Sequence, residues 1–277
     1  MNALVGERMS IITNKPQTTR HRIIGILSEE DYQIVFSDTP GIIEDPSYKM
    51  QEVMNAFVKT TFEDADLMLF VTTVEEQYKA DDPIVEKLKA VEAPLFLVLN
   101  KIDLVKPGRV LQLIKWWNDL IPFKETIPMA ALHKNNTDTL LKVILDYLPE
   151  GPAYYPKDQL TDRPERFFVS EIVREKILEY YHQEIPYSVE VIVTSFKEGT
   201  NRNEEPLIRI SAEIYVARKT QKSIIIGQGG KAIKHLGMEA RKALETWLEQ
   251  KVFLELHVKV KDNWRDDDRL LKHFGYR

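Results

Sequence analysis

The residues best suited to a specific chemical task follow an apolar run over positions 94–99. They are Asn100, Lys101, Ile102 and Asp103. An aspartate carboxylate at the end of a strand can accept two parallel hydrogen bonds from the N1–H and 2-amino groups of guanine, an edge that adenine lacks. The lysine stem can pack over the ring, and the asparagine can tie neighbouring loops together. The tetrapeptide therefore favours guanine recognition, with an ordinary strand-to-helix turn as the alternative.

A second candidate sequence follows the apolar stretch 32–37 and could serve a phosphate and a metal ion. Its residues are Asp38, Thr39, Pro40, Gly41 and Ile42. The Asp38 carboxylate can hold Mg²⁺ through water, and the Gly41 amide can donate to a terminal phosphate. Ile42 has no group that could orient an attacking water, so we expect slow hydrolysis. Taken alone, these residues also fit a simple turn.

Two threonines upstream could complete the shell of such a metal ion. Thr18 and Thr19 lie in the polar stretch 17–22, and a hydroxyl from a flexible loop can bind Mg²⁺ directly. Read alone, this stretch predicts a basic surface loop. The three sequences together, in this order and each beside an apolar run, favour a GTP-binding domain that uses Mg²⁺.

One part of a GTP site has no counterpart in the sequence. No G-x-x-x-x-G-K-[ST] loop, whose backbone amides normally cradle the phosphates, occurs in the 277 residues. Residues 1–8 look like the tail of the helix that follows such a loop. We expect that the sequence is truncated at its N-terminus. The alternative is a protein that has lost nucleotide binding.

Composition limits the class of protein. With 277 residues and 43% hydrophobic content, the chain can form two domains that each bury a core. The absence of cysteine excludes disulfides and thiolate metal sites. No apolar run has the length of a membrane span, and the first residues carry no signal-peptide pattern, so we expect a cytoplasmic protein. A net charge of -5 argues against a globally basic surface, so polyanion binding would need a local patch.

Strand-like and helix-like patterns alternate over residues 1–148. The predicted strands cover residues 32–37, 66–73, 94–99 and 125–130. The predicted helices cover residues 47–62, 83–91, 109–120 and 137–147. Alternation of this kind predicts an α/β domain, in which helices cover both faces of a parallel sheet and ligands bind at the carboxyl ends of the strands.

A stretch rich in proline and glycine separates this domain from a second one. We predict a linker over residues 149–164 and an α+β domain over residues 165–277. The pattern of the second domain is helix, strand, strand, helix, helix, strand. Its strands, predicted over 187–196, 207–216 and 252–260, alternate with the period of two that half-buried strands show.

The turn between the paired helices of this domain is a candidate nucleic-acid site. The turn and its neighbours comprise Lys222, Ile226, Gly227, Gln228, Gly229, Gly230, Lys231 and Lys234. Glycines let a nucleic-acid backbone approach, and the amides that open the next helix carry partial positive charge toward phosphates. Seven lysines and arginines lie between positions 215 and 242, against one acid. This excess favours RNA binding over the alternative of a solvated helix face.

With these motifs in place, the whole chain resembles the GTPase Era family. Members of that family join a P-loop GTPase domain to a KH domain of the bacterial, type II topology. The resemblance rests on residues 17–22, 38–41, 100–103, 227–230 and the closing stretch 258–265. It implies that Ala130 and Ala131 contact the base, although the run Met129-Ala130-Ala131 stands where the family usually has a serine before the alanine that contacts the base.

The resemblance also implies an activity and partners. It implies a hydrolase of GTP that uses Mg²⁺, assists assembly of the small ribosomal subunit and binds the 3′ end of the small-subunit ribosomal RNA. We expect a cytoplasmic monomer with peripheral contact with the inner membrane, as in the family. Two other hypotheses stay open: an RNA-binding adaptor that binds no nucleotide, and a GTPase whose second domain binds protein.

Overall fold

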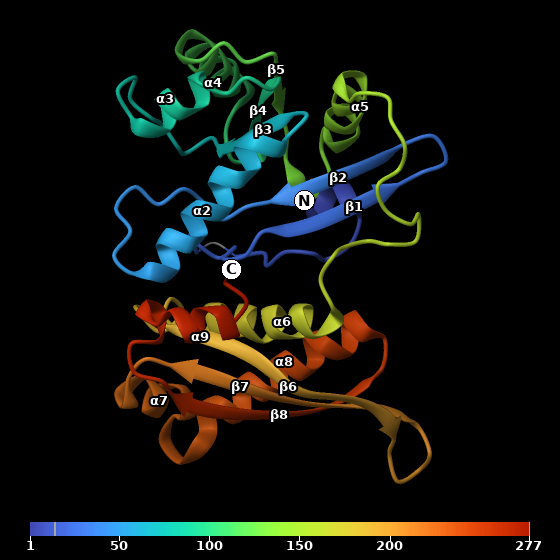
Figure 1. The fold of residues 1–277 in the computed structure, drawn as a ribbon, viewed down its shortest axis with the longest axis vertical. Helices are drawn as coiled ribbons and strands as arrows, with labels where there is room; N and C mark the ends of the chain where they lie inside the picture. The colour runs from blue at the N-terminus through green and yellow to red at the C-terminus, as the bar shows by residue number, and fades with distance from the viewer. Residues whose placement is uncertain (14, 277) are drawn as a thin grey trace. The chain divides into compact units, whose positions relative to one another are not determined.

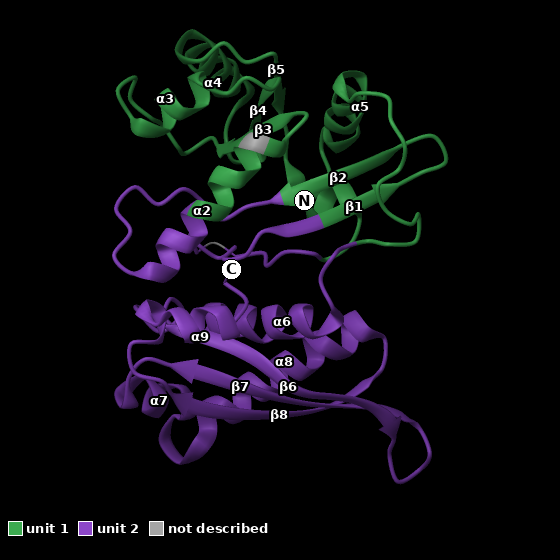
Figure 2. Cartoon of the chain, viewed as in Figure 1, with its two compact units in different colours: residues 1–8, 25–37, 56–160 green, residues 9–24, 38–55, 161–277 purple. Residues whose placement is uncertain are grey.

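Backbone contacts divide the protein into two compact units. The computed structural model describes residues 1–13 and 15–276. Unit 1 comprises residues 1–8, 25–37 and 56–160, and unit 2 comprises residues 9–24, 38–55 and 161–277 (Figure 2). These units do not follow the predicted boundaries at 148 and 165, because segments 9–24 and 38–55 of the predicted first domain are grouped with the C-terminal half.

Strands and helices alternate in the N-terminal half, as the sequence predicts (Figure 1). The strands are β1 (Ile23–Ser28), β2 (Gln33–Asp38), β3 (Met68–Thr73), β4 (Leu95–Asn100) and β5 (Glu125–Pro128). The helices are α1 (Asn2–Val5), α2 (Lys49–Asp64), α3 (Pro83–Lys89), α4 (Pro107–Leu120) and α5 (Thr137–Tyr147), with the 3-10 turns η1 (Ile102–Leu104) and η2 (Ala131–His133). None of the helices in the described residues is long and apolar enough to cross a membrane.

The parallel sheet of unit 1 places the ends of neighbouring strands together. Its order is β3-β4-β5, with Thr73 beside Asn100 and Leu99 beside Pro128. Strand β4 is buried from residue 95 to residue 99, as expected for a parallel strand covered on both faces. The loops that follow β4 and β5 therefore leave the sheet at the same edge.

The expected single sheet is divided in two. Strands β1 and β2 form a separate two-stranded sheet, and the outer edge of β3 has no strand partner among the residues that the structure describes. Strand β1 lies outside the elements predicted from the sequence, although Ile23 and Ile26 are buried. Gly25 interrupts its apolar pattern and lies against α1, since a Cβ there would be 2.9 Å from the sulfur of Met1 and 3.0 Å from Cγ2 of Val5.

Unit 2 contains the predicted α+β domain. Its elements are α6 (Glu165–Tyr180), β6 (Val189–Thr200), β7 (Pro206–Val216), α7 (Lys219–Ile226), η3 (Gln228–Gly230), α8 (Lys231–Leu248), β8 (Lys251–Val260), η4 (Trp264–Asp266) and α9 (Asp268–His273). The sheet order is β6-β7-β8, with β6 antiparallel and β8 parallel to β7. Helices α6, α7 and α8 pack their apolar residues against the sheet in one core. The predicted order of helices and strands is confirmed.

Trp117 in α4 packs among other aromatic side chains. Its side chain is 0% exposed, and its ring centroid lies 5.3 Å from that of Phe70 and 6.3 Å from that of Phe123. The neighbouring Trp116 is only half-buried.

We predict that Trp117→Ala lowers the free energy of unfolding by about 3–5 kcal/mol, because it opens a cavity among these rings. The matched change Trp116→Ala should cost about 1 kcal/mol or less. Urea unfolding followed by circular dichroism measures both. Equal losses for the two variants would show that Trp117 is not the anchor of this aromatic cluster.

Candidate nucleotide and RNA sites

Asn100, the last residue of β4, joins the loops that follow β4 and β5. Its Oδ1 accepts hydrogen bonds from the backbone N–H of Lys101 at 2.8 Å and of Ala131 at 3.0 Å. The N–H of Ile102 donates to the carbonyl of Met129 at 3.3 Å. The loops from two neighbouring strands are thereby held together, as expected of an asparagine in a guanine-binding loop.

Asp103 is the group of this loop that can read a base. It lies in η1 with its side chain 32% exposed, so its carboxylate can accept hydrogen bonds from a ligand. Nε2 of His133 lies 3.6 Å from Asp103 Oδ2, a neighbour that nothing in the local sequence singles out. The N–H groups of Ala130 and Ala131 donate to the Asn135 carbonyl and to Asn100. Base recognition would therefore depend on Asp103 rather than on these two amides.

Asp38 ends β2, and its carboxylate has a hydroxyl partner that sequence reasoning missed. Oγ of Ser10 donates to Asp38 Oδ2 at 2.6 Å. Farther along the loop, Ile43 N–H donates to Asn55 Oδ1 at 3.0 Å and Asn55 Nδ2 donates to the Ile43 carbonyl at 2.7 Å. The loop with Thr39, Pro40, Gly41 and Ile42 is thus fixed on both sides, while Gly41 is exposed.

The Asp38 carboxylate fits its expected role, which is to hold Mg²⁺ through water. Among the described residues, no group of three or more histidine, cysteine, aspartate and glutamate side chains could hold a metal ion. Magnesium keeps several waters and binds through one or two carboxylates together with substrate phosphates. A single carboxylate with a hydroxyl beside it is therefore compatible with a metal that arrives with a nucleotide.

The stretch 17–22 is not the exposed basic loop that its composition predicts. Arg20 is 2% exposed and His21 is 5% exposed, and Thr18 and Thr19 are half-buried. The carbonyl of Thr18 accepts a hydrogen bond from Nη2 of Arg174 at 2.6 Å. The prediction is wrong because charge in a sequence does not reveal a partner about 150 residues away. Unit 2 contains Thr18, Thr19 and Asp38. Unit 1 contains residues 100–103, the candidate base-reading loop.

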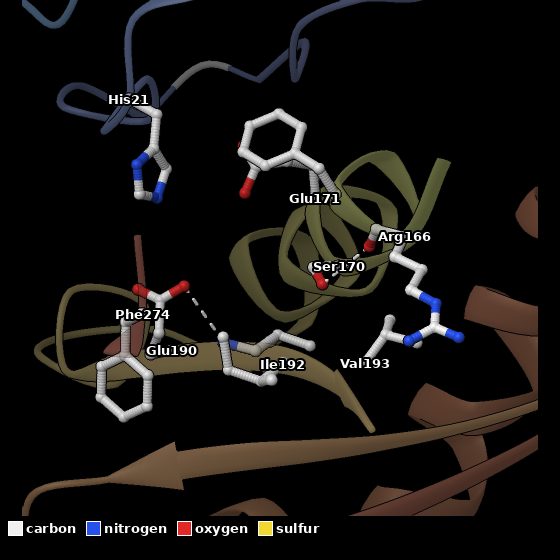
Figure 3. Close-up of a pocket in the computed structure, with 10 residues that line it drawn as sticks. His21, Arg166, Ser170, Glu171, Glu190, Ile192, Val193 and Phe274 are labelled. Carbon is white, nitrogen blue, oxygen red and sulfur yellow. Dashed lines mark hydrogen bonds between the residues drawn. The ribbon is translucent and has the colours of Figure 1, made fainter. Parts of the chain in front are cut away.

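His21 lines a pocket of about 180 Å³ together with Glu171 and Glu190 (Figure 3). Its ring centroid lies 4.4 Å from that of Tyr276 and 5.6 Å from that of Phe167. Its Nδ1 is buried and has no hydrogen-bond partner among the residues that the structure describes. His21 is thus an exception to the rule that buried polar atoms have hydrogen-bond partners.

The G-x-x-G turn has the backbone geometry that glycines allow. Gly227, Gly229 and Gly230 have φ angles of 70°, 60° and 76°, in the left-handed range that side chains disfavour. A Cβ at Gly227 would also lie 2.6 Å from the Cβ of Ala232, whereas Gly229 and Gly230 face open space. The last two glycines therefore leave room for a nucleic-acid backbone.

Basic side chains flank this turn. Lys231 and Lys234 are exposed in the first turns of α8, and Lys222 is half-buried in α7. Gln228 is exposed, whereas Ile226 packs against the core. Cationic side chains and the free N–H groups at the start of α8 both attract phosphates.

The fold and the two sites define a class of protein that joins an α/β nucleotide-binding domain to a KH domain. The sequence profile of the 50S ribosome-binding GTPase family matches residues 1–101, and that of the KH domain matches residues 184–265. GTPase Era of Alkaliphilus metalliredigens (strain QYMF) is 43% identical over 279 residues, which cover 100% of this chain and 92% of that protein. The chain belongs to the GTPase Era family.

Two further comparisons support this assignment. The chloroplastic GTPase ERA-like protein of Oryza sativa subsp. japonica is 45% identical over 279 residues, and the chain spans 65% of its length. A crystal structure of Era in complex with MgGDPNP and nucleotides 1506–1542 of 16S ribosomal RNA is 37% identical, with a TM-score of 0.92. That likeness covers 99% of this chain and 92% of the other.

The buried imidazole of His21 makes the free energy of unfolding depend on pH. Burial lowers its pKa from 6.5 to about 3; Glu171 opposes this shift, and Arg163, Arg174 and Arg20 add to it. Between these two pKa values the unfolded chain binds a proton at this residue that the folded protein does not bind. The free energy of unfolding therefore falls as the pH falls through this window.

We predict that His21→Phe, which keeps the ring contacts, reduces this fall by about 1.4 kcal/mol per pH unit between about pH 6 and about pH 4. Changing the exposed His235 to Phe should leave the slope as it is in the unaltered protein. Urea unfolding at a series of pH values measures the slopes. An unchanged slope in His21→Phe would mean that this imidazole is protonated in the folded state.

Proposed function

We propose that the protein binds and hydrolyses GTP, and that it assists small-subunit assembly by binding the 3′ end of the small-subunit ribosomal RNA. The observation that carries the GTP part is the tie from Asn100 to Ala131, which leaves the Asp103 carboxylate open to a ligand. Membership of the GTPase Era family and the relative bound to MgGDPNP and 16S ribosomal RNA support the whole proposal.

Each nucleotide-site residue has a role in this proposal. Asp103 accepts the forked donor edge of guanine, Lys101 packs over the ring and Asn100 holds the loop. Asp38 would hold Mg²⁺ through water, and Thr18 or Thr19 would contact the metal when GTP is bound. Catalysis then consists of positioning and charge stabilisation, with GTP and Mg²⁺ as cofactors. Turnover is slow, because Ile42 cannot orient the attacking water.

An RNA-binding adaptor without nucleotide binding is the competing function. The observation that favours it is the lack of a G-x-x-x-x-G-K-[ST] sequence in the 277 residues. Titration with a fluorescent GTP analogue tests the chain directly, and tight binding contradicts the adaptor. Translation of the DNA upstream of Met1 in frame tests it further, because a strand followed by that loop would also contradict it.

The RNA part of the proposal assigns the grip on RNA to residues 222–234. The amides of the G-x-x-G turn and of the start of α8 bind the phosphates, with Lys222, Lys231 and Lys234 adding charge. We keep the domain assignment 1–148, 149–164 and 165–277 as part of this proposal. We also propose that the protein is a cytoplasmic monomer that makes peripheral contact with the inner membrane.

In a version of the chain that carries a phosphate-binding loop, we predict that Asp103→Asn lowers GTP affinity by about 100-fold. The change removes a charge-assisted pair of hydrogen bonds and creates a donor that suits the 2-oxo group of xanthine. Affinity for xanthosine triphosphate should rise. The matched control is Asp119→Asn, which alters only an exposed ion pair with Lys115 in α4. Retained preference for GTP in Asp103→Asn would contradict the base assignment.

For the RNA part, we predict that Gly229→Asp weakens binding of single-stranded RNA at least about tenfold, because it sets a carboxylate beside the phosphates. Gly229→Asn has the same shape without the charge and tolerates the left-handed backbone equally well, so it should weaken binding much less. Gel-shift titration measures both. Equal affinity of the two variants and the unaltered chain would place the RNA elsewhere.

A further inference from the structure

The carboxyl end of α6 is capped by a lysine from a distant part of the chain. The last carbonyls of a helix lack partners within the helix and favour a nearby cation, yet α6 has no basic residue in its last turn. Nζ of Lys15 donates to the carbonyl of Leu178 and, at 2.5 Å, to that of Tyr181. Lys15 thereby fixes both the end of α6 and the backbone of Tyr181.

Tyr181 connects this helix end to the G-x-x-G turn. Its side chain is 7% exposed, and its hydroxyl donates to the carbonyl of Ile225 at 2.8 Å. Ile225 lies in the last turn of α7, two residues before Gly227, whose N–H donates to the carbonyl of Ser223. Tyr181 therefore connects the carboxyl end of α6 to the carboxyl end of α7, just before the G-x-x-G turn.

Residues 15–22 are held to the same unit at further points. Arg20 donates to the carbonyl of Val189 at 2.6 Å, to that of Pro186 at 2.9 Å and to the Glu190 carboxylate at 3.3 Å. The hydroxyl of Tyr276 donates to Glu190 at 2.7 Å. These groups are all buried, so a movement of the segment would leave buried charges without partners. The segment therefore responds as one body to a shift at the end of α6.

We propose that Lys15 and Tyr181 are positioning residues that link the G-x-x-G turn to residues 15–22, so that RNA bound at the turn orders the segment with Thr18 and Thr19. This inference rests on the proposed RNA binding. RNA restricts the motion of the carboxyl end of α7. The hydrogen bond from Tyr181 to Ile225 then restricts the end of α6, and the hydrogen bonds from Lys15 to that helix end restrict residues 15–22. Because coupling of binding free energies is reciprocal, loosening the segment weakens RNA binding.

Amide hydrogen exchange in the 277-residue chain tests the first half of the link. Single-stranded RNA should slow exchange of residues 15–22 by about fivefold or more, the lower end of typical coupling. Tyr181→Phe removes only the hydroxyl, and in this variant bound RNA should leave the exchange unchanged. A role of Tyr181 in folding alone would not make the exchange depend on RNA. RNA binding without a change at residues 15–22 in the unaltered chain overturns the link.

A pair of matched lysine variants tests the second half. Lys15→Met and Lys176→Met each remove one positive charge and keep an unbranched side chain, but Lys176 pairs with Glu175 and Glu179 on its own helix, α6. By fluorescence anisotropy, Lys15→Met should weaken RNA binding about fivefold or more and Lys176→Met less than about twofold. Lys15→Arg should restore affinity. In the double variant of Lys15 and Tyr181 the two losses should not add, because each breaks the same link.

The outcomes separate this inference from the function on which it rests. If the unaltered chain binds no single-stranded RNA, the proposed RNA binding is wrong and the link is wrong with it. If it binds RNA and the two lysine variants bind equally, only the link is overturned.

Discussion

A buried charge is tolerated only with a partner, and this requirement determines where residues 15–22 lie. The Arg20 guanidinium is 2% exposed and finds two backbone carbonyls and the Glu190 carboxylate in the C-terminal half of the chain. Arg174 bonds both Glu171 and the carbonyl of Thr18. The segment with two candidate metal-binding hydroxyls is therefore part of the unit that contains the KH fold. The proposed metal-binding threonines and the proposed RNA site therefore belong to the same compact unit.

The base-reading loop depends on a different constraint. Parallel strands end at the same edge of a sheet, and the single side-chain oxygen of Asn100 joins the loops after β4 and β5. This tie occupies the N–H of Ala131 and leaves the Asp103 carboxylate accessible. Discrimination among bases would accordingly come from one carboxylate.

Features set by local patterns could be predicted from the sequence, and features set by distant partners could not. The burial of β4 and the alternation along β7 follow from runs of neighbouring residues, so the fold class and most elements were predictable. Strand β1 was missed because Gly25 interrupts its apolar pattern, and its contact with Met1 cannot be read from the sequence. Lys15 was missed because its carbonyl partners lie 163 and 166 residues away. Ser10 and His133 were missed for the same kind of reason. Only the folded structure shows that Ser10 contacts Asp38 and that His133 lies beside Asp103.

We propose that one chain carries a GTP site and an RNA site that are coupled through residues 15–22. The most direct measurement is the rate of GTP hydrolysis by a version with a phosphate-binding loop, with and without single-stranded RNA from the 3′ end of small-subunit ribosomal RNA. The account predicts slow hydrolysis alone and faster hydrolysis with RNA, because RNA would order Thr18 and Thr19, the residues that would contact the metal ion. Hydrolysis that is absent, or that proceeds at the same rate when the RNA site is saturated, would contradict it.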